Sequence, residues 1–447
     1  MSIFEKDKQY VAGTYARFPL ELSEGNGALL YGEDDKEYID LGSGIAVNTF
    51  GTADAEWVEA VTVQASLLGH TSNLYYTKPC AELAQMLCER TGMKKVFFSN
   101  SGAEANECAI KTARLWALKN KGEGNSTIIT LKNSFHGRTI TTLAATGQDN
   151  FHTDFGPFTE GFVYAEANNL DSVKELAEAN GCAAIMMETI QGEGGVLPLT
   201  DEFVKGVFDL AKEKNMLVII DEVQTGNGRT GKLYSYMHYG VMPDIVSTAK
   251  GLAGGLPLGC TMLGEKVQDI LAPGSHGSTF GGNPLACAAG NAVMETIEQE
   301  GIIDNVQDVS AELFEKLNKL RSKYNCIRSV RGKGLLIGIE FDDTITAQGM
   351  REQLFTMGIL VSAIGKSTIR LAPPLILTKA QANQFIKALD KILKNTAGPK
   401  NVFGRIKDAL PTKKQIKEST ASIGNAKIDK LDQAGLTATK DATPDDE

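Results

Sequence analysis

Residues 216–224 read MLVIIDEVQ, and this segment indicates the fold class most clearly. Its first five residues are apolar and lead into two carboxylates, Asp221 and Glu222. An uninterrupted apolar run of this length is typical of a strand buried on both faces of a parallel sheet, and such sheets bind ligands at the carboxyl ends of their strands. Because successive side chains of a strand point to opposite faces, only one of the two carboxylates can face a given ligand. Gln224 reaches the same ligand if the chain turns after Val223.

A second run, PDIVSTAKG at residues 243–251, brings Lys250 to the end of another strand and continues into a glycine-rich turn over 251–257. A lysine that is desolvated there becomes a nucleophilic amine able to form a Schiff base. Pyridoxal phosphate requires an amine for its aldehyde and an acid for its ring nitrogen. Lys250 and Asp221 are therefore the candidate catalytic residues, with pyridoxal phosphate as the expected cofactor.

Residues 51–300 alternate apolar strands with amphipathic segments, which predicts a large α/β domain with a mostly parallel sheet. Helices are expected over 103–119 and 201–214. The expected strands are 96–98, 127–131, 183–187, 217–220, 244–247 and 260–263.

The two ends differ from this pattern. Residues 1–50 hold short strand and turn signals, and residues 301–395 mix helices with strands expected at 334–340 and 367–371. We expect both ends to pack into one smaller α+β domain. Residues 396–447 are rich in Lys, Thr, Asp, Ala and Gly, so a disordered tail is expected there, although its composition also allows a short helix over 413–434.

Composition excludes several classes of function. A net charge of −10 and a pI near 5.3 argue against nucleic-acid binding. No apolar run is long enough to span a membrane, and the N-terminus lacks the apolar core of a signal peptide. The seven cysteines are never spaced as CxxC, so neither a disulfide framework nor a zinc site is expected. We expect a cytoplasmic protein without a metal.

Residues 98–107 read FSNSGAEANE, a strand that enters a small-residue turn and then a helix. The free N–H groups at a helix N-terminus bind anions, and Gly102 leaves room for a phosphate to approach the backbone. Ser101, Gly102 and Ala103 are thus candidate phosphate ligands. The alternative is a helix that Asn100 or Ser101 caps without any ligand.

Two further segments follow expected strands. In residues 133–139, Phe135 can stack on an aromatic ring and Arg138 can bind a carboxylate, whereas His136 is interpreted as structural. In residues 188–196, Glu193 lies among glycines and is a candidate site carboxylate. Its natural partner is Arg370, which could instead be an ordinary surface residue; the sequence alone does not establish the pair.

Two further glycine-rich segments could bind phosphate groups, and each has an alternative interpretation. Residues 226–232 match the phosphate-loop pattern GxxxxGK, but the next residue, Leu233, has no hydroxyl for magnesium, so we reject a nucleotide triphosphatase. In residues 274–285, the hydroxyls of Ser278 and Thr279 can bind phosphate oxygens, although a tight loop alone explains this segment equally well.

Taken together, these motifs resemble the class III aminotransferases, and within them the acetylornithine aminotransferases. The resemblance covers about residues 8–395 and rests on the following segments: NSGAEANE at 100–107, FHGR at 135–138, QGEGG at 191–195, DEVQ at 221–224, AKG at 249–251 and GSTFGGNP at 277–284. It implies a pyridoxal phosphate enzyme of fold type I that forms a homodimer with active sites at the subunit interface.

The resemblance also implies roles for the cofactor-binding residues. Lys250 would bind the cofactor aldehyde, Asp221 the ring nitrogen and Gln224 the ring hydroxyl, with Phe135 stacked on the ring. The phosphate would be held by Ser101, Gly102 and Ala103, with Thr279 of the partner subunit.

For the substrates, the resemblance implies that Arg138 binds the carboxylate of the amino donor and that Arg370 binds a carboxylate of the keto acid. Glu193 would cover Arg370 when the other substrate is present, and Ser278 is a further candidate substrate contact. The donor is expected to be N-acetyl-L-ornithine and the acceptor 2-oxoglutarate, as in arginine biosynthesis. Ornithine, succinylornithine and 4-aminobutyrate are alternative donors, and an aminomutase or decarboxylase is an alternative reaction class.

Overall fold

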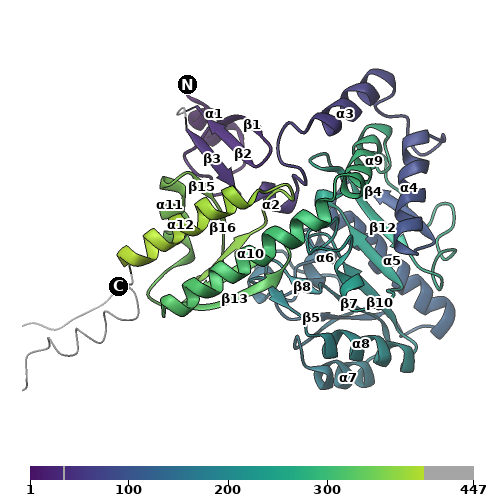
Figure 1. Cartoon of the computed structure of the whole chain (residues 1–447). Helices are drawn as coiled ribbons and strands as arrows, with labels where there is room; N and C mark the ends of the chain where they lie inside the picture. Colours follow the sequence, from purple (N-terminus) through teal and green to yellow (C-terminus); the bar gives the residue numbers. More distant parts are fainter. Residues whose placement is uncertain (34–35, 397–447) are drawn as a thin grey trace, which may run out of the picture. The chain divides into compact units, whose positions relative to one another are not determined.

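The computed structural model describes residues 1–33 and 36–396 (Figure 1). Its centre is a seven-stranded sheet. In spatial order the strands are β4 (Lys95–Ser99), β12 (Gly259–Leu263), β11 (Ile245–Thr248), β10 (Leu217–Asp221), β7 (Cys182–Met187), β5 (Thr127–Leu131) and β6 (Phe162–Ala165).

The sheet confirms the expected α/β class. Neighbouring strands pair in parallel except around β12, which is antiparallel to both β11 and β4. The six expected strands are all present, with ends within one residue of those predicted. Sequence reasoning missed β6, a four-residue strand at the edge of the sheet whose first three residues are only partly buried. Its sequence, FVYA, is an apolar run of only four residues, and periodicity alone does not identify so short a run as a strand.

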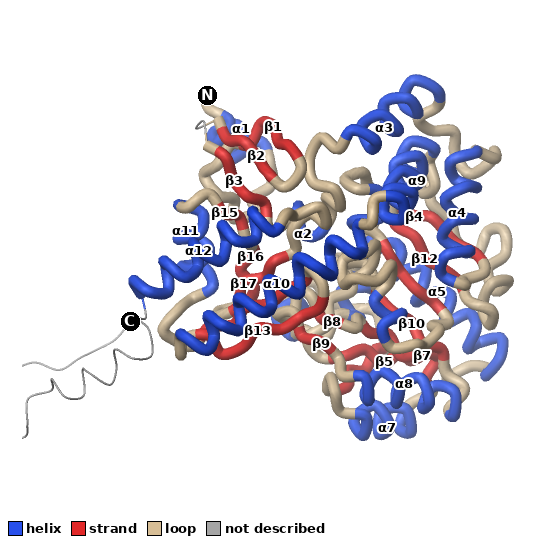
Figure 2. Tube along the Cα trace, viewed as in Figure 1, coloured by secondary structure: helices blue, strands red, loops and turns tan. Residues whose placement is uncertain are grey.

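Helices surround this sheet (Figures 1 and 2). In chain order they are α3 (Ala55–Leu67), α4 (Lys78–Thr91), α5 (Gly102–Lys121), α6 (Ile140–Ala145), α7 (Leu170–Ala179), α8 (Asp201–Glu213) and α9 (Pro284–Gln299). Short 3-10 turns lie at Asp149–Phe151, Ser235–His238 and Lys250–Ala253.

Strand β10 explains why both faces of the sheet are covered. Leu217 and Ile219 belong to a hydrophobic cluster that includes apolar residues of α5. Val218 and Ile220 belong to a second cluster, which includes apolar residues of α7 and α8. Alternate residues of one strand thus pack against helices on opposite faces, as the uninterrupted apolar run predicts. The sheet is therefore buried on both faces.

The two ends of the chain meet in a second sheet. Its order is β1 (Leu22–Asn26), β2 (Leu29–Gly32), β3 (Glu37–Asp40) and β15 (Ile359–Leu360). The parallel pairing of β3 with β15 joins the first fifty residues to the segment after residue 300. The exact domain boundaries stay a prediction.

A third sheet carries the C-terminal part of the described chain. Its order is β13 (Ile327–Lys333), β14 (Leu336–Phe341), β17 (Thr368–Leu371) and β16 (Ser362–Ile364). The remaining elements are α1 (Ile3–Tyr10), α2 (Ser43–Ala46), the two-stranded pair β8 (Ile190–Gln191) and β9 (Leu197–Pro198), α10 (Ile302–Lys323), α11 (Ala347–Thr356) and α12 (Lys379–Thr396).

The disordered tail and its short helix fall on residues outside the described range, apart from Thr396, which ends α12. Within residues 1–33 and 36–396, no helix has both the length and the apolar character needed to cross a bilayer.

Candidate functional site

A cavity of about 240 Å³ lies at the carboxyl edge of the large sheet. Its lining comes from segments that directly follow β4, β5, β7, β10 and β11. The lining residues are Gly102, Ala103, Asn106, Phe135, His136, Gly137, Arg138, Glu188, Glu193, Asp221, Val223, Gln224 and Lys250. Eight of the predicted site residues are in this set, brought together from segments up to about 150 residues apart.

Lys250 begins the 3-10 turn after β11 with a backbone φ of +46°, a left-handed conformation that non-glycine residues rarely adopt. The surrounding backbone is held in place, because Asn227 Nδ2 donates to the Ala249 carbonyl at 3.1 Å and Thr49 Oγ1 donates to the Gly251 carbonyl at 2.8 Å. Burial lowers the pKa of the Lys250 amine to about 8, although the nearby Glu193 carboxylate opposes this. The amine therefore becomes largely neutral only above about pH 8, instead of above its ordinary pKa of 10.5.

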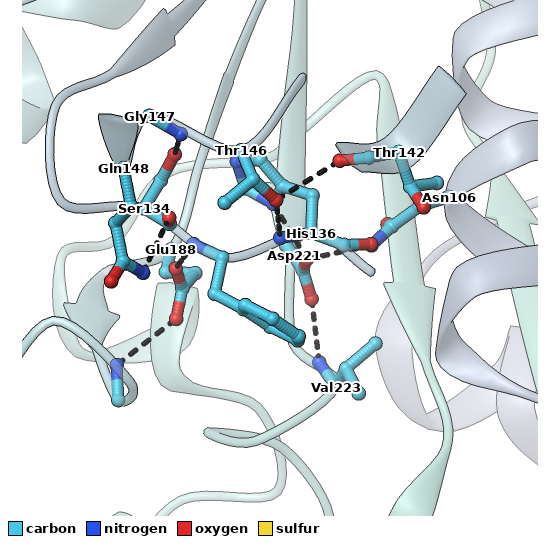
Figure 3. Close-up of polar contacts among 12 residues, drawn as sticks. Asn106, Ser134, His136, Thr142, Thr146, Gly147, Gln148, Glu188, Asp221 and Val223 are labelled. Atoms are coloured by element: carbon cyan, nitrogen blue, oxygen red, sulfur yellow. Dashed lines mark hydrogen bonds and ion pairs between the residues drawn. The ribbon is translucent and has the colours of Figure 1, made fainter. Parts of the chain in front are cut away.

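Asp221 is buried at the end of β10 and is held by three donors (Figure 3). Asn106 Nδ2 and His136 Nδ1 each lie 2.8 Å from Oδ2, and the Val223 N–H lies 3.0 Å from Oδ1. Glu222 faces the other side, where it accepts hydrogen bonds from Thr225, Ser235 and Tyr236. The alternation expected for an extended strand thus selects Asp221 as the carboxylate in the cavity.

Glu193 and Arg370 form an ion pair with 2.6 Å between Oε1 and Nη1. Arg370 is only 2% exposed, so its interpretation as an ordinary surface residue is wrong. The same Nη1 donates to Gln224 Oε1 at 3.0 Å and to the Gly192 carbonyl at 3.1 Å. Burial raises the pKa of Glu193, but the charges of Arg370 and Lys250 outweigh this and hold the pKa below its ordinary value. Gln224 therefore connects the cavity to the ion pair.

A glycine at position 192 makes this close packing feasible. A Cβ atom at Gly192 would lie 1.9 Å from Gln224 Oε1, so any larger residue would displace the Gln224 amide from its present position. Close approach of the Gln224 side chain thus explains Gly192, whereas Gly194 lies against the Asn133 backbone and Gly195 has a backbone φ of +113°.

Helix α5 points its N-terminus at the cavity. Ser101 is its N-cap, with the side-chain oxygen accepting the Glu104 N–H at 3.2 Å, so the capping alternative is correct for this hydroxyl. The Gly102 and Ala103 backbones remain on the cavity wall. A Cβ at Gly102 would lie 2.6 Å from Val223 Cγ1, so a side chain here would collide with the opposing Val223.

Arg138 is exposed and lies over two aromatic rings. Its guanidinium carbon is 4.2 Å from the ring centroid of Phe151 and 5.6 Å from that of Phe135. The two rings contact each other edge to face at 5.8 Å. Stacking on both rings presents the planar guanidinium at the cavity mouth, where a carboxylate can reach it.

Ser278 and Thr279 do not line the cavity. Ser278 Oγ accepts hydrogen bonds from Asn100 Nδ2 at 3.1 Å and from the Gly281 N–H at 2.9 Å, which fits the alternative of a tight loop. Thr279 is exposed on that loop. Within one described chain, these two residues are therefore not brought to the site.

Sequence reasoning missed five residues of the cavity wall. It interprets His136 as structural, yet the His136 ring holds Asp221, and it gives no role to Asn106, Gly137, Glu188 and Val223. Val223 lies in the turn after β10, which ends at Asp221, so strand alternation could not have identified it. Burial raises the pKa of Glu188 to about 7.

Comparison with known proteins gives a consistent result. Residues 10–393 match the family described as Aminotransferase class-III. The chain is similar to the acetylornithine aminotransferase of Haemophilus ducreyi, at 46% identity over 88% of this chain and 98% of that protein. It is also similar to the acetylornithine aminotransferase of Methanocaldococcus jannaschii, at 43% identity over 86% of this chain and 96% of that protein.

Solved structures of aminotransferases are similar in fold to this chain. An ornithine aminotransferase from Toxoplasma gondii, described with partial occupancy of PLP at its active site, has a TM-score of 0.84 at 33% identity and covers 88% of this chain and 94% of its own. An acetylornithine aminotransferase from Elizabethkingia anophelis has a TM-score of 0.79 at 35% identity, with coverage of 88% and 98%. The expected fold type is thereby confirmed.

Proposed function

Because the chain belongs to the class III aminotransferases, we propose that it moves the ω-amino group of N-acetyl-L-ornithine to 2-oxoglutarate. The products are N-acetylglutamate semialdehyde and glutamate, and the reaction serves arginine biosynthesis. The observation that carries this proposal is 46% identity to an acetylornithine aminotransferase over 98% of that protein's length. The groups that line the cavity also suit the reaction. Pyridoxal phosphate is the cofactor.

The cavity residues fit that cofactor. The Gly102 and Ala103 N–H groups at the start of a 20-residue helix suit a phosphate, with the Ser101 cap fixing the turn. Phe135 and Val223 offer apolar contact for an aromatic ring, and Gln224 offers an amide for a ring hydroxyl. A carboxylate has about four lone-pair positions, so the three donors on Asp221 leave capacity for one more, the protonated ring nitrogen.

When bound, pyridoxal phosphate supplies an electron sink for the substrate carbon that loses a proton. Lys250 provides the covalent attachment point and, as a neutral amine above about pH 8, accepts that proton and returns it. Asp221 stabilises positive charge on the ring nitrogen, and His136 with Asn106 keeps the carboxylate oriented.

Two arginines bind the carboxylates of the two substrates. Arg138 at the cavity mouth binds the carboxylate of the amino donor. Arg370 binds a carboxylate of 2-oxoglutarate, and Glu193 neutralises Arg370 while the donor is present. This exchange lets one cavity accept substrates that differ by one carboxylate.

We also propose a homodimer in which Thr279 reaches the phosphate of the partner's site, with Ser278 contacting substrate near the same interface. Exposed apolar side chains support an interface around this loop: Leu67, Leu74, Tyr75, Tyr76 and Phe280. The seven cysteines are free, which favours the cytoplasm.

A panel of donors tests the proposed substrate. Purified enzyme with 2-oxoglutarate should form glutamate from each donor tested, and kcat/KM should be highest for N-acetyl-L-ornithine. Ornithine is the most serious competitor, because solved ornithine aminotransferases share this fold at a TM-score of 0.84. Faster turnover of ornithine, succinylornithine or 4-aminobutyrate would overturn the donor assignment. Product formed without any glutamate would instead indicate an aminomutase or decarboxylase.

A further inference from the structure

Glu188 is a buried carboxylate that the proposed mechanism leaves unused. It directly follows β7, is only 5% exposed and lines the cavity. Its two oxygens accept hydrogen bonds from two different loops (Figure 3): Oε1 from the Phe135 N–H at 2.8 Å, and Oε2 from the Gly192 N–H at 3.0 Å. The side chain therefore bridges backbone segments that are 57 residues apart.

The bridged loops are those that meet the two substrates. The first carries Phe135 and, three residues later, Arg138. The second carries Gly192, whose carbonyl accepts from Arg370, and Glu193, which forms the ion pair with that arginine. One carboxylate thus links the donor-binding loop to the loop that covers the acceptor-binding arginine.

The chemistry of the bridge requires an ionised glutamate. A carboxylate only accepts hydrogen bonds and has two oxygens, whereas a glutamine amide would place an N–H donor against one of the two backbone N–H groups. Burying a charge is costly, and burial with the nearby Asp221 charge raises the pKa of Glu188 to about 7, against the lowering influence of His136. A carboxylate that only filled space would be disfavoured at such a position.

We propose that Glu188 is a positioning residue that couples the two substrate-binding loops. It keeps the loop bearing Glu193 in its closed arrangement over Arg370 while Arg138 engages the donor and Phe135 contacts the cofactor ring. The inference rests on the proposed function, because that function assigns the donor to one loop and the acceptor to the other.

The E188Q variant tests this coupling, with E222Q as the matched control. Glu222 is equally buried and also accepts several hydrogen bonds, but it faces away from the cavity. The donor and acceptor half-reactions are followed separately through cofactor absorbance. For E188Q, kcat/KM for the donor should fall about tenfold, which is the effect expected when one hydrogen bond to a charged group is lost. In the same variant, kcat/KM for 2-oxoglutarate should change less than about twofold.

A second measurement needs no catalysis. In cofactor-free protein, hydrogen exchange should become faster in E188Q within both 133–138 and 190–195, whereas E222Q should leave both segments unchanged. Equal slowing of the two half-reactions by E188Q, or faster exchange in one loop only, would overturn the coupling. If no tested donor reacts but both loops loosen together, the proposed function fails and the coupling stands.

Discussion

Replacing Glu193 with alanine should destabilise the ligand-free protein while strengthening its binding of 2-oxoglutarate. The substitution removes the 2.6 Å ion pair with Arg370, which is 2% exposed. Loss of a partner from a fully buried pair costs about 3–5 kcal/mol. Here Gln224 Oε1 and the Gly192 carbonyl remain as acceptors and Glu193 is 27% exposed, so we expect a loss of about 1.5–3 kcal/mol in the free energy of unfolding.

The pH dependence of this loss has a definite sign. The pKa of Glu193 is below its ordinary value of 4.5 in the folded protein, so its stabilising contribution is present above pH 4.5 and disappears as the pH falls through the folded pKa. Urea unfolding at pH 7 should therefore show the full difference between wild type and E193A, and unfolding at progressively more acidic pH should show a smaller one.

Calorimetry then compares the affinity of E193A and of wild type for 2-oxoglutarate. Because the ligand no longer competes with Glu193 for Arg370, its affinity should rise about tenfold in E193A. Glu312→Ala is the control, since Glu312 has similar exposure and pairs with Lys316 on α10, far from this ion pair in the sequence. Unchanged or weaker binding of 2-oxoglutarate to E193A would refute the competition between Glu193 and the substrate.

The same geometry supports three further predictions. Gly102→Ala places a Cβ 2.6 Å from Val223 Cγ1, so equilibrium dialysis should show at least about tenfold weaker binding of pyridoxal phosphate; unaltered affinity would argue against the phosphate cradle. Acylation of Lys250 in cofactor-free protein, followed by mass spectrometry, should rise with a midpoint near pH 8, since burial lowers its pKa to about 8; a midpoint near 10.5 would contradict this. His136→Ala removes one of three donors to Asp221 and should lower the free energy of unfolding, measured in urea, by about 1.5–3 kcal/mol; an unchanged free energy of unfolding would contradict this.

The sheet and the central chemistry could be predicted because they depend on local patterns. The apolar run before Asp221 marks a doubly buried strand, and its alternation separates Asp221 from Glu222, as the hydrogen bonds of the two carboxylates confirm. Lys250 was located by a similar run and its glycine-rich turn. Its left-handed backbone could not be foreseen, because tertiary contacts from Thr49 and Asn227 hold it.

The pairings across the site depend on contacts that no local pattern encodes. Arg370 lies 177 residues from Glu193 in sequence, and His136 lies 85 residues from Asp221. Both pairs exist because the carboxyl ends of several strands meet at one sheet edge and because β17 is placed beside it. Glu188 was missed for the same reason, since its two partners are backbone N–H groups of separate loops, which carry no side-chain signal.

The most direct measurement of the central claim is reductive trapping of the cofactor. Enzyme loaded with pyridoxal phosphate is treated with sodium borohydride, digested and mapped by mass spectrometry. We expect a phosphopyridoxyl group on the peptide that contains Lys250, and none in the Lys250→Ala variant. A label on another lysine, or no label on any peptide, would contradict it.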